Sequence, residues 1–539
     1  MSADAPAAAD RRIEVCDETL RDGTQAEGIA FSVESKLRLL QEFDGLGIDF
    51  VVGGWPFSNP RDIEFFRRAK EVSLRHTQLM PFGSTRRKDN APSEDPNLVA
   101  LVETGCHYAT IFGKSWELHA TEILRVTLEE NVEMIRSSVR FLTDAGMSVL
   151  YDAEHFFDGY TRNRPYALET LRAAVDGGAV RLVLCDTNGG TLPLELGDIV
   201  ADVVTEFPGT PVGIHAHNDS GVGDANTLMG VERGASQVQG TFNGYGERCG
   251  NANLCAVVPN LALKMDRDCL VPGALAELTH VSRLVSELAN HAHNERQAYV
   301  GRSAFAHKGG VHIDAARKNP LSYEHVEPEL VGNKQRILIS DQAGRSAIIE
   351  KLESEYPDLD KRSPEVQRVY DSMKEAEQLG YAFEGAEASW NLLARKAMGE
   401  HTPGFELHGF RLIIEKFQTH DMRSEATIKV REPNGLEEHT AAEGDGPVNA
   451  LDNALRKALE TFYPYLRDVT LVDYNVRVLD SQSSTAARVR VLTESTDGEE
   501  TWGTVGVSEN IVEASWKALV DSFEHKIQKE MRRQAGVSV

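Results

Sequence analysis

The stretch Val180-Arg-Leu-Val-Leu-Cys-Asp-Thr187 is a short, mostly apolar run that ends in polar residues. Such a run is typical of a strand buried in a parallel sheet. Seven more runs of this kind occur, at residues 13–20, 49–54, 79–84, 108–113, 148–155, 211–218 and 237–244. Their ends lie roughly 30 residues apart, which is the length of one strand plus one helix. Amphipathic helical patterns fill the intervals, as at residues 33–46, 121–145 and 194–207.

Eight strands that alternate with helices over about 250 residues predict a (β/α)8 TIM barrel, an α/β fold. The alternative is an open, doubly wound sheet, which usually has fewer strands and a GxGxxG turn after the first one. Residues 17–28, at the end of the first run, lack that turn. We therefore expect a catalytic barrel over residues 13–270, preceded by a disordered N-terminus at 1–12.

The region after the barrel, residues 271–400, predicts helical linker subdomains. Helical patterns occur at residues 274–293 and 365–380. Breaks in the pattern occur at Tyr356-Pro-Asp and at Arg362-Ser-Pro. We expect this region to connect two domains.

The last region, residues 401–539, predicts an α+β domain. Patterns typical of strands occur at residues 411–417, 425–431, 470–479 and 487–492. Two amphipathic helices, 446–459 and 510–523, superimpose at an offset of 64 residues, which places Thr440 on Thr504. We expect two similar halves, each a strand-strand-helix unit. The helices could share Val, Ala and Leu by chance, but a small β-rich domain is expected either way.

The composition excludes several classes of protein. The chain has 57 Lys and Arg against 83 Asp and Glu, a net charge of −26. Nucleic-acid and anionic-membrane binders need a basic surface, so we expect neither partner. No apolar run approaches the roughly 18 residues of a membrane span, and the N-terminus lacks the apolar core of a signal peptide. The six cysteines form no CxxC pair. These features predict a cytoplasmic enzyme with reduced thiols.

Polar residues cluster where the predicted strands end. Because a TIM barrel has its active site at the carboxyl ends of its strands, we expect these residues to meet at one rim. His215 and His217 point to the same face of one strand and can reach one ion. Two histidines alone could equally be a hydrogen-bonded pair. With Asp22, Glu154 and Asn251 at the same rim, a divalent metal site becomes the favoured hypothesis.

Three side chains at this rim, Arg21, Glu154 and Thr187, suggest chemistry. Arg21, next to Asp22, could stabilise an oxygen on which negative charge develops, or it could form a rim salt bridge. Glu154 could act as an acid or base, or orient a water molecule. The Thr187 hydroxyl could bind a carboxylate.

Three motifs together identify a family: Asp17-Glu-Thr-Leu-Arg-Asp-Gly-Thr-Gln25, His215-Ala-His-Asn218 and Gly246-Glu-Arg-Cys-Gly-Asn251. Over essentially its whole length the chain resembles the metal-dependent, acyl-CoA-condensing barrel enzymes, which include 2-isopropylmalate, homocitrate and citramalate synthases. The resemblance implies four metal ligands, Asp22, His215, His217 and Asn251. It also implies that Arg21 contacts the keto acid's oxygens, and that Glu154 and Thr187 contact substrate.

The stretch Phe305-Ala-His-Lys-Gly-Gly-Val-His-Ile-Asp314 resembles the family's linker motif. That motif reaches into the partner subunit's active site, which implies a homodimer. His312 matches the family's catalytic histidine, and Tyr323 matches a catalytic tyrosine. His312 is followed by Ile-Asp-Ala and not by the Gln-Asp-Gly common in isopropylmalate synthases. The C-terminal region resembles the family's amino-acid-sensing regulatory domain, which implies a branched-chain amino acid such as isoleucine as effector.

The stretches Gly53-Gly-Trp-Pro56, Asp152–Tyr160 and Thr241–Leu254 most resemble the citramalate synthase branch. This resemblance implies condensation of acetyl-CoA with pyruvate and water to give citramalate and CoA, for isoleucine biosynthesis via 2-oxobutanoate, with Mg²⁺, Mn²⁺ or Zn²⁺ as cofactor. The base could be His312, Glu154 or a bound water. Four alternatives stay open: a 2-isopropylmalate synthase, a homocitrate synthase, a lyase on the same barrel, and an inactive metal-binding amino-acid sensor.

The net negative charge poses a problem, because a keto acid and CoA are themselves anions. Attraction to the site must therefore be local. We expect a positively charged mouth formed by the metal, Arg21, Lys114 and the basic stretch Arg86-Arg-Lys88.

Overall fold

The computed structural model describes residues 11–308, 310–337, 345–352, 356, 359–360, 362–416, 422–479 and 487–534. The chain forms two compact units. The first comprises Met1–Phe305 and Glu324–Gln335, and the second comprises Ala306–Tyr323 and Arg336–Val539. The predicted disordered N-terminus falls almost wholly outside the described residues. In the described part of the chain, no helix is both long and apolar enough to cross a membrane.

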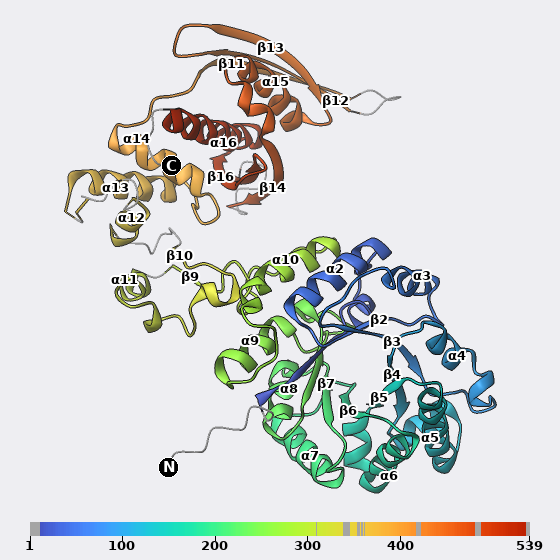
Figure 1. The fold of residues 1–539 in the computed structure, drawn as a ribbon. Helices are drawn as coiled ribbons and strands as arrows, with labels where there is room; N and C mark the ends of the chain where they lie inside the picture. The colour runs from blue at the N-terminus through green and yellow to red at the C-terminus, as the bar shows by residue number, and fades with distance from the viewer. Residues whose placement is uncertain are drawn as a thin grey trace. The chain divides into compact units, whose positions relative to one another are not determined.

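The predicted TIM barrel is confirmed. Eight parallel strands close in chain order, and β8 pairs with β1 (Figure 1). The strands are β1 Glu14–Asp17, β2 Phe50–Gly54, β3 Gln78–Ser84, β4 Tyr108–Lys114, β5 Ser148–Glu154, β6 Arg181–Asp186, β7 Val212–Ala216 and β8 Gln237–Gly240. The stretch Val180–Thr187 is therefore β6 with one flanking residue at each end.

Helices surround the strands of the barrel (Figure 1). They are α2 Val33–Leu46, α3 Pro60–Ala69, α4 Pro96–Glu103, α5 Leu128–Asp144, α6 Phe156–Gly177, α7 Pro193–Glu206 and α8 Gly223–Glu232, followed by α9 Leu254–Lys264 and α10 Leu278–Leu288. Local signals set their ends. In α2, the Ser32 hydroxyl accepts a hydrogen bond from the Ser35 N–H (3.0 Å), and Gly47 ends the helix in the left-handed conformation.

The barrel is a packed core and not an open channel. Inward-facing side chains fill it, among them Phe50, Val52, Met80 and Leu150, which are all buried. The alternate residues of the same strands pack outward against the helices and belong with them to the largest hydrophobic cluster among the described residues. This filled interior leaves space for a ligand only where the strands end.

The second unit begins with short elements and then helices. β9 Ala306–His307 pairs with β10 Arg336–Ile337, and α11 Gly310–Lys318 lies between them in the chain. The helices α12 Arg345–Leu352, α13 Pro364–Gln378 and α14 Glu387–Met398 follow, so the helix predicted at 365–380 is present. The domain boundaries placed at residues 270 and 400 stay predictions.

The C-terminal part consists of two similar halves, as the repeat predicts. The first half has β11 Glu406–Glu415, β12 Arg423–Arg431, β13 Glu437–Gly444 and α15 Pro447–Phe462, and the second has β14 Thr470–Val478, β15 Val489–Thr496, β16 Thr501–Ser508 and α16 Ile511–Gln534. Thr440 donates a hydrogen bond to the Ala454 carbonyl (2.9 Å), and Thr504 donates one to the Ala518 carbonyl (2.8 Å). The aligned residues thus make the same contact in both halves.

Each half has three antiparallel strands and not the two expected. The strand signals missed β13 and β16. β13 is rich in acidic residues and alanine, and in β16 two glycines interrupt the threonines and valines, so neither shows the unbroken β-branched pattern used for the prediction.

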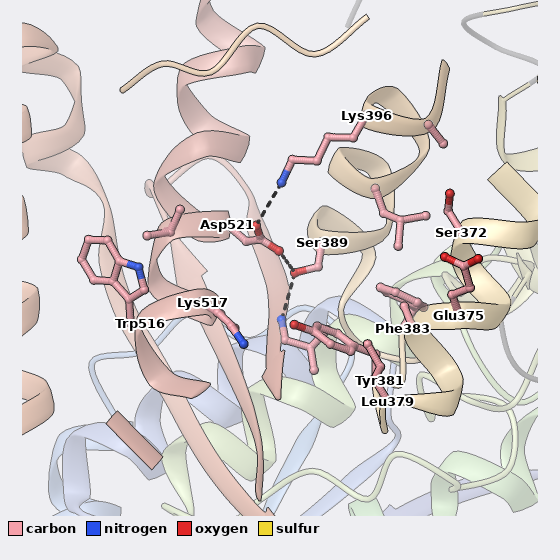
Figure 2. A pocket seen from close by; sticks show the side chains of 15 residues that line it. Ser372, Glu375, Leu379, Tyr381, Phe383, Ser389, Lys396, Trp516, Lys517 and Asp521 are labelled. Atoms are coloured by element: carbon pink, nitrogen blue, oxygen red, sulfur yellow. Dashed lines mark hydrogen bonds and ion pairs between the residues drawn. The ribbon is translucent and has the colours of Figure 1, made fainter. Parts of the chain in front are cut away.

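The second unit also contains a cavity of about 680 Å³, lined by residues of α13, α14, β16 and α16 (Figure 2). The Ser389 hydroxyl donates to the Asp521 carboxylate (2.6 Å), and the Lys396 ammonium lies 3.9 Å from the same group. Lys517 pairs with Glu513 (3.0 Å). Three of the four charged side chains that line this cavity, Lys396, Lys517 and Asp521, thus have an oppositely charged partner within the chain.

Candidate metal centre and active site

The carboxyl ends of the barrel strands surround a cavity of about 250 Å³. Residues that follow different strands line it. Among them are six of the residues predicted for the site: Arg21, Asp22, Glu154, Thr187, His215 and His217. The barrel therefore gathers side chains that lie far apart in the sequence at one rim.

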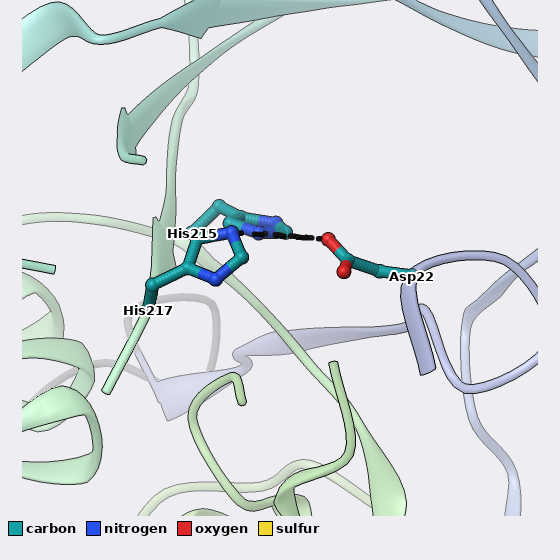
Figure 3. A group of neighbouring side chains, drawn as sticks. All are labelled: Asp22, His215 and His217. Carbon is teal, nitrogen blue, oxygen red and sulfur yellow. Dashed lines mark ion pairs between the residues drawn. The ribbon is translucent and has the colours of Figure 1, made fainter. Parts of the chain in front are cut away.

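Three buried side chains form a cluster that could hold a metal ion (Figure 3). Asp22 follows β1, whereas His215 lies on β7 and His217 follows it directly. The Asp22 Oδ2 atom lies 3.6 Å from His215 Nε2 and 3.9 Å from His217 Nε2. Such separations suit an ion bound about 2 Å from each atom, and the nitrogen and oxygen donors suit a divalent transition metal.

The outer nitrogen of His215 has a fixed partner. β7 pairs with β8 so that His215 lies opposite Gln239, and His215 Nδ1 lies 3.0 Å from Gln239 Oε1. An amide oxygen can only accept, so Nδ1 carries the proton and Nε2 keeps its lone pair toward Asp22. This is the arrangement that metal-binding histidines use.

Replacing Gln239 with leucine is expected to weaken metal binding about 10- to 100-fold, because the His215 ring loses the acceptor that fixes its tautomer and orientation. Titration of the metal-free protein with Mn²⁺ or Zn²⁺ measures the change. Gln239→Glu, which keeps an acceptor, serves as the matched control. An unchanged affinity in Gln239→Leu would show that this hydrogen bond has no part in the site.

Asn251 lies directly beside the cluster. Its main chain bridges to that of His217, and its amide nitrogen donates to the Tyr245 carbonyl (3.1 Å). Gly246 makes this approach possible, since a Cβ there would lie 2.2 Å from the Asn251 amide nitrogen. Asn251 Oδ1, Asp22 Oδ1 and His217 Nδ1 are buried without a hydrogen-bond partner among the described residues. Unpaired buried oxygens beside two histidines fit a bound cation.

The surrounding charges keep Asp22 ionised. Burial acts to raise the pKa of this carboxyl, but the positive charge of Arg21, with smaller contributions from the neighbouring side chains, outweighs burial and holds the pKa below its ordinary value. Arg21 Nη1 lies 3.3 Å from Asp22 Oδ2. An ionised carboxylate is the form that binds a metal.

Arg21 is held in place from three sides. Besides Asp22, its Nε donates to Glu18 Oε2 (2.8 Å), and its guanidinium carbon lies 3.8 Å from the centroid of the Phe82 ring. Glu18 is fully buried. Arg21 therefore forms a rim salt bridge and also lines the cavity, so the two interpretations offered for it are compatible.

The prediction that Lys114 and residues 86–88 provide positive charge at the cavity is wrong. Lys114 and Glu154 end neighbouring strands in register and form an ion pair, which neutralises Lys114. Arg86 donates to the Ser137 hydroxyl (3.0 Å) and to main-chain carbonyls, and the stretch 86–88 does not line the cavity. The cations that line the cavity are Arg21 and Arg248. Arg248 belongs to one of the identifying motifs, but its position in the sequence gave no role for it.

No role in the site was predicted for the other lining residues. Trp55, Phe82 and Phe112 form an aromatic wall, and the Trp55 indole N–H donates to Asn97 (2.8 Å). Asp152 lies two residues before Glu154 and faces the same cavity; burial, followed by the charge of Glu18, raises the pKa of Asp152 to about 7. An alternation of strand residues predicts which side chains face inward, but not their pKa values.

His312 and Tyr323 belong to the second unit. Their rings stack with centroids 4.2 Å apart, and both side chains are exposed. The structure thus brings these two residues together as a pair. Their participation in an active site, and that of a partner subunit, stays a prediction.

Comparisons with known proteins cover most of the chain. Residues 12–285 match the family described as HMGL-like, residues 299–380 match the homocitrate synthase post-HMGL domain-like family, and residues 384–527 match the LeuA allosteric (dimerisation) domain.

Among curated relatives, five (R)-citramalate synthases are 44–53% identical to the chain. The one from Geobacter sulfurreducens is 53% identical over 96% of this chain and 98% of its own. A probable 2-isopropylmalate synthase from Methanopyrus kandleri is 31% identical over 94% of this chain and 97% of its own. A solved hydroxymethylglutaryl-CoA lyase from Pseudomonas aeruginosa covers 52% of this chain and 95% of its own, at 16% identity and a TM-score of 0.45. The chain therefore belongs to the family of HMGL-like barrel enzymes that includes the (R)-citramalate and 2-isopropylmalate synthases.

Proposed function

We propose that the chain is an acyltransferase that condenses acetyl-CoA with pyruvate and water to give citramalate and CoA. The observation that carries this proposal is the cluster of Asp22, His215 and His217 beside Arg21, in a chain similar to (R)-citramalate synthases over nearly its full length. The 2-isopropylmalate and homocitrate synthase activities are the alternatives within the family.

Asp22, His215, His217 and Asn251 would hold the divalent metal. A bound divalent metal polarises the carbonyl of a keto acid toward attack. The chain contributes the geometry of the site: buried donors, a fixed His215 tautomer and the tight turn at Gly246.

The other lining residues suit a small keto acid. Arg21 lies beside Asp22, and its guanidinium would stabilise the negative charge that develops on the keto oxygen during attack. Thr187 offers a hydroxyl to the carboxylate. The aromatic wall of Trp55, Phe82 and Phe112 limits the room for the third substituent, which in pyruvate is only a methyl group.

The proton leaves the acetyl methyl group to a base, for which Glu154, His312 and a bound water are the candidates. Glu154 lines the cavity and pairs with Lys114. His312 would come from the partner subunit of a homodimer, with Tyr323 stacked on its ring. A dimer is supported by the match of residues 384–527 to a dimerisation domain.

An assay of CoA release from acetyl-CoA tests the proposal. The metal-loaded protein is given pyruvate, 2-ketoisovalerate or 2-ketoglutarate, and we expect the highest kcat/KM with pyruvate. A preference for 2-ketoisovalerate would assign 2-isopropylmalate synthase activity, and a preference for 2-ketoglutarate would assign homocitrate synthase activity. No release with any of them would favour a lyase or an inactive sensor.

A further inference from the structure

Thr187, which follows β6, is held by hydrogen bonds from two other parts of the rim. Its hydroxyl oxygen accepts a hydrogen bond from the His155 main-chain N–H (2.9 Å), just beyond the end of β5. Its carbonyl accepts one from Arg248 Nη2 (2.7 Å), in the loop after β8.

The two residues that hold Thr187 share an unusual conformation. His155 and Arg248 both have a φ of +56°, in the left-handed region that residues other than glycine rarely adopt. Such a conformation persists only where the surrounding structure enforces it, and it is concentrated at functional sites. Two strained residues that converge on one threonine suggest that the position of this threonine matters.

Arg248 is itself anchored. Its Nε and Nη2 atoms donate to the two carboxylate oxygens of Asp219, at 2.8 and 2.9 Å. Asp219 in turn packs against Gly189, where a Cβ would lie 2.5 Å from the carboxylate. We call Thr187, Asp219 and Arg248 the rim clamp.

The hydrogen bond from His155 limits what the Thr187 hydroxyl can do. One lone pair of its oxygen is occupied by the His155 N–H. In the parts of the chain that the structure describes, no acceptor takes the hydroxyl proton, and Thr187 lines the cavity. The hydroxyl therefore has a proton to donate to an anionic oxygen in the cavity.

We propose that Arg248 is a positioning residue, which holds Thr187 so that its hydroxyl donates to the carboxylate of the keto acid. This inference rests on the proposed function, because it assumes a keto acid in the cavity. Arg248 therefore acts indirectly. Its guanidinium donates hydrogen bonds to the Thr187 carbonyl and to Asp219, and Thr187 contacts the substrate.

Steady-state kinetics on the full chain test this role. Thr187→Val keeps the shape of the side chain but removes the donor, and a lost hydrogen bond to a charged group is expected to raise KM for pyruvate about 10- to 100-fold. Arg248→Met is expected to raise KM to a similar extent, with a much smaller change in kcat. Thr187→Ser, which restores the hydroxyl, is expected to recover most of the affinity.

Two variants distinguish a positioning role of Arg248 from direct attraction between its charge and the carboxylate of the substrate. Asp219→Asn keeps the Arg248 charge at the cavity but weakens its anchor, so we expect a raised KM here too. In the Thr187→Val background, Arg248→Met is expected to add little, because both changes remove the same contact. Arg67, which makes two hydrogen bonds to Glu64 on the exposed face of α3, provides the matched control Arg67→Met.

Metal titration of each variant completes the test, because the loop that carries Arg248 also carries Asn251. A positioning role leaves metal affinity within about twofold of the wild type. The inference is overturned if Arg248→Met leaves KM for pyruvate unchanged, if its effect adds fully to that of Thr187→Val, or if its effect follows a loss of metal. Failure of the proposed function looks different, since the wild type would then release no CoA with pyruvate.

Discussion

Replacing His217 with alanine is expected to abolish both metal binding and turnover. His217 is buried, and its Nε2 atom lies 3.9 Å from Asp22 Oδ2 in the cluster with His215. Alanine leaves only one imidazole there, and we expect the affinity for Mn²⁺ or Zn²⁺ to fall by at least about 100-fold, since a direct ligand should matter more than the roughly 10- to 100-fold of an outer partner. The rate of CoA release should fall to background.

Metal content after dialysis, together with titration of the metal-free protein, measures this loss. His107 offers a matched control, because it is an exposed histidine just before β4, at the opposite end of the barrel strands. His107→Ala should bind metal as the wild type does. If His217→Ala still took up one equivalent with wild-type affinity, His217 would not be a ligand.

Replacing Arg21 with alanine is expected to lower kcat about 100- to 1,000-fold, the effect of losing one donor to a developing oxyanion. Metal binding should be retained, because Arg21 contacts Asp22 but does not belong to the ligand cluster. Lysine at this position should restore little activity, since an ammonium cannot replace a guanidinium that bridges Glu18 and Asp22.

A loss of stability has to be separated from the loss of turnover in Arg21→Ala. Without Arg21, the buried Glu18 carboxylate loses its partner, and such a change costs about 3–5 kcal/mol. The double variant Arg21→Ala with Glu18→Gln removes that charge and should recover stability without activity. Thermal unfolding measures the loss of stability. Assays at a temperature where the variant stays folded measure the loss of turnover. Turnover near the wild-type level in a folded Arg21→Ala would remove this residue from the mechanism.

The sequence carried enough information to predict the barrel, because its signal is repeated eight times. Each strand is buried on both faces and therefore reads as an apolar run, and the rule that TIM-barrel sites form where strands end placed Asp22, His215 and His217 at one rim. The strand-by-strand reading failed for β13 and β16, whose sequences are acidic or rich in glycine. Their strand state depends on pairing with neighbours and on packing against a helix.

The contacts that tune the site could not be predicted from the sequence. The rim clamp depends on the left-handed conformations of His155 and Arg248, which no residue type requires. The partner of His215 is Gln239, and its identity follows only from the register of β7 and β8. The raised pKa of Asp152 depends on burial next to Glu18. The sequence shows which side chains could bind a metal or a substrate, whereas their orientations are known only from the folded structure.

The central claim is that the metal cluster and Arg21 lie at a site that joins acetyl-CoA to pyruvate. The most direct test is carbon-13 NMR of the products formed from pyruvate and acetyl-CoA labelled in the acetyl methyl group, with and without a chelator. We expect citramalate labelled at its methylene carbon, one free CoA per citramalate, and no product once the metal is removed. Release of CoA with labelled acetate as the only labelled product would contradict the account, because the protein would then be hydrolysing the thioester without forming the carbon–carbon bond.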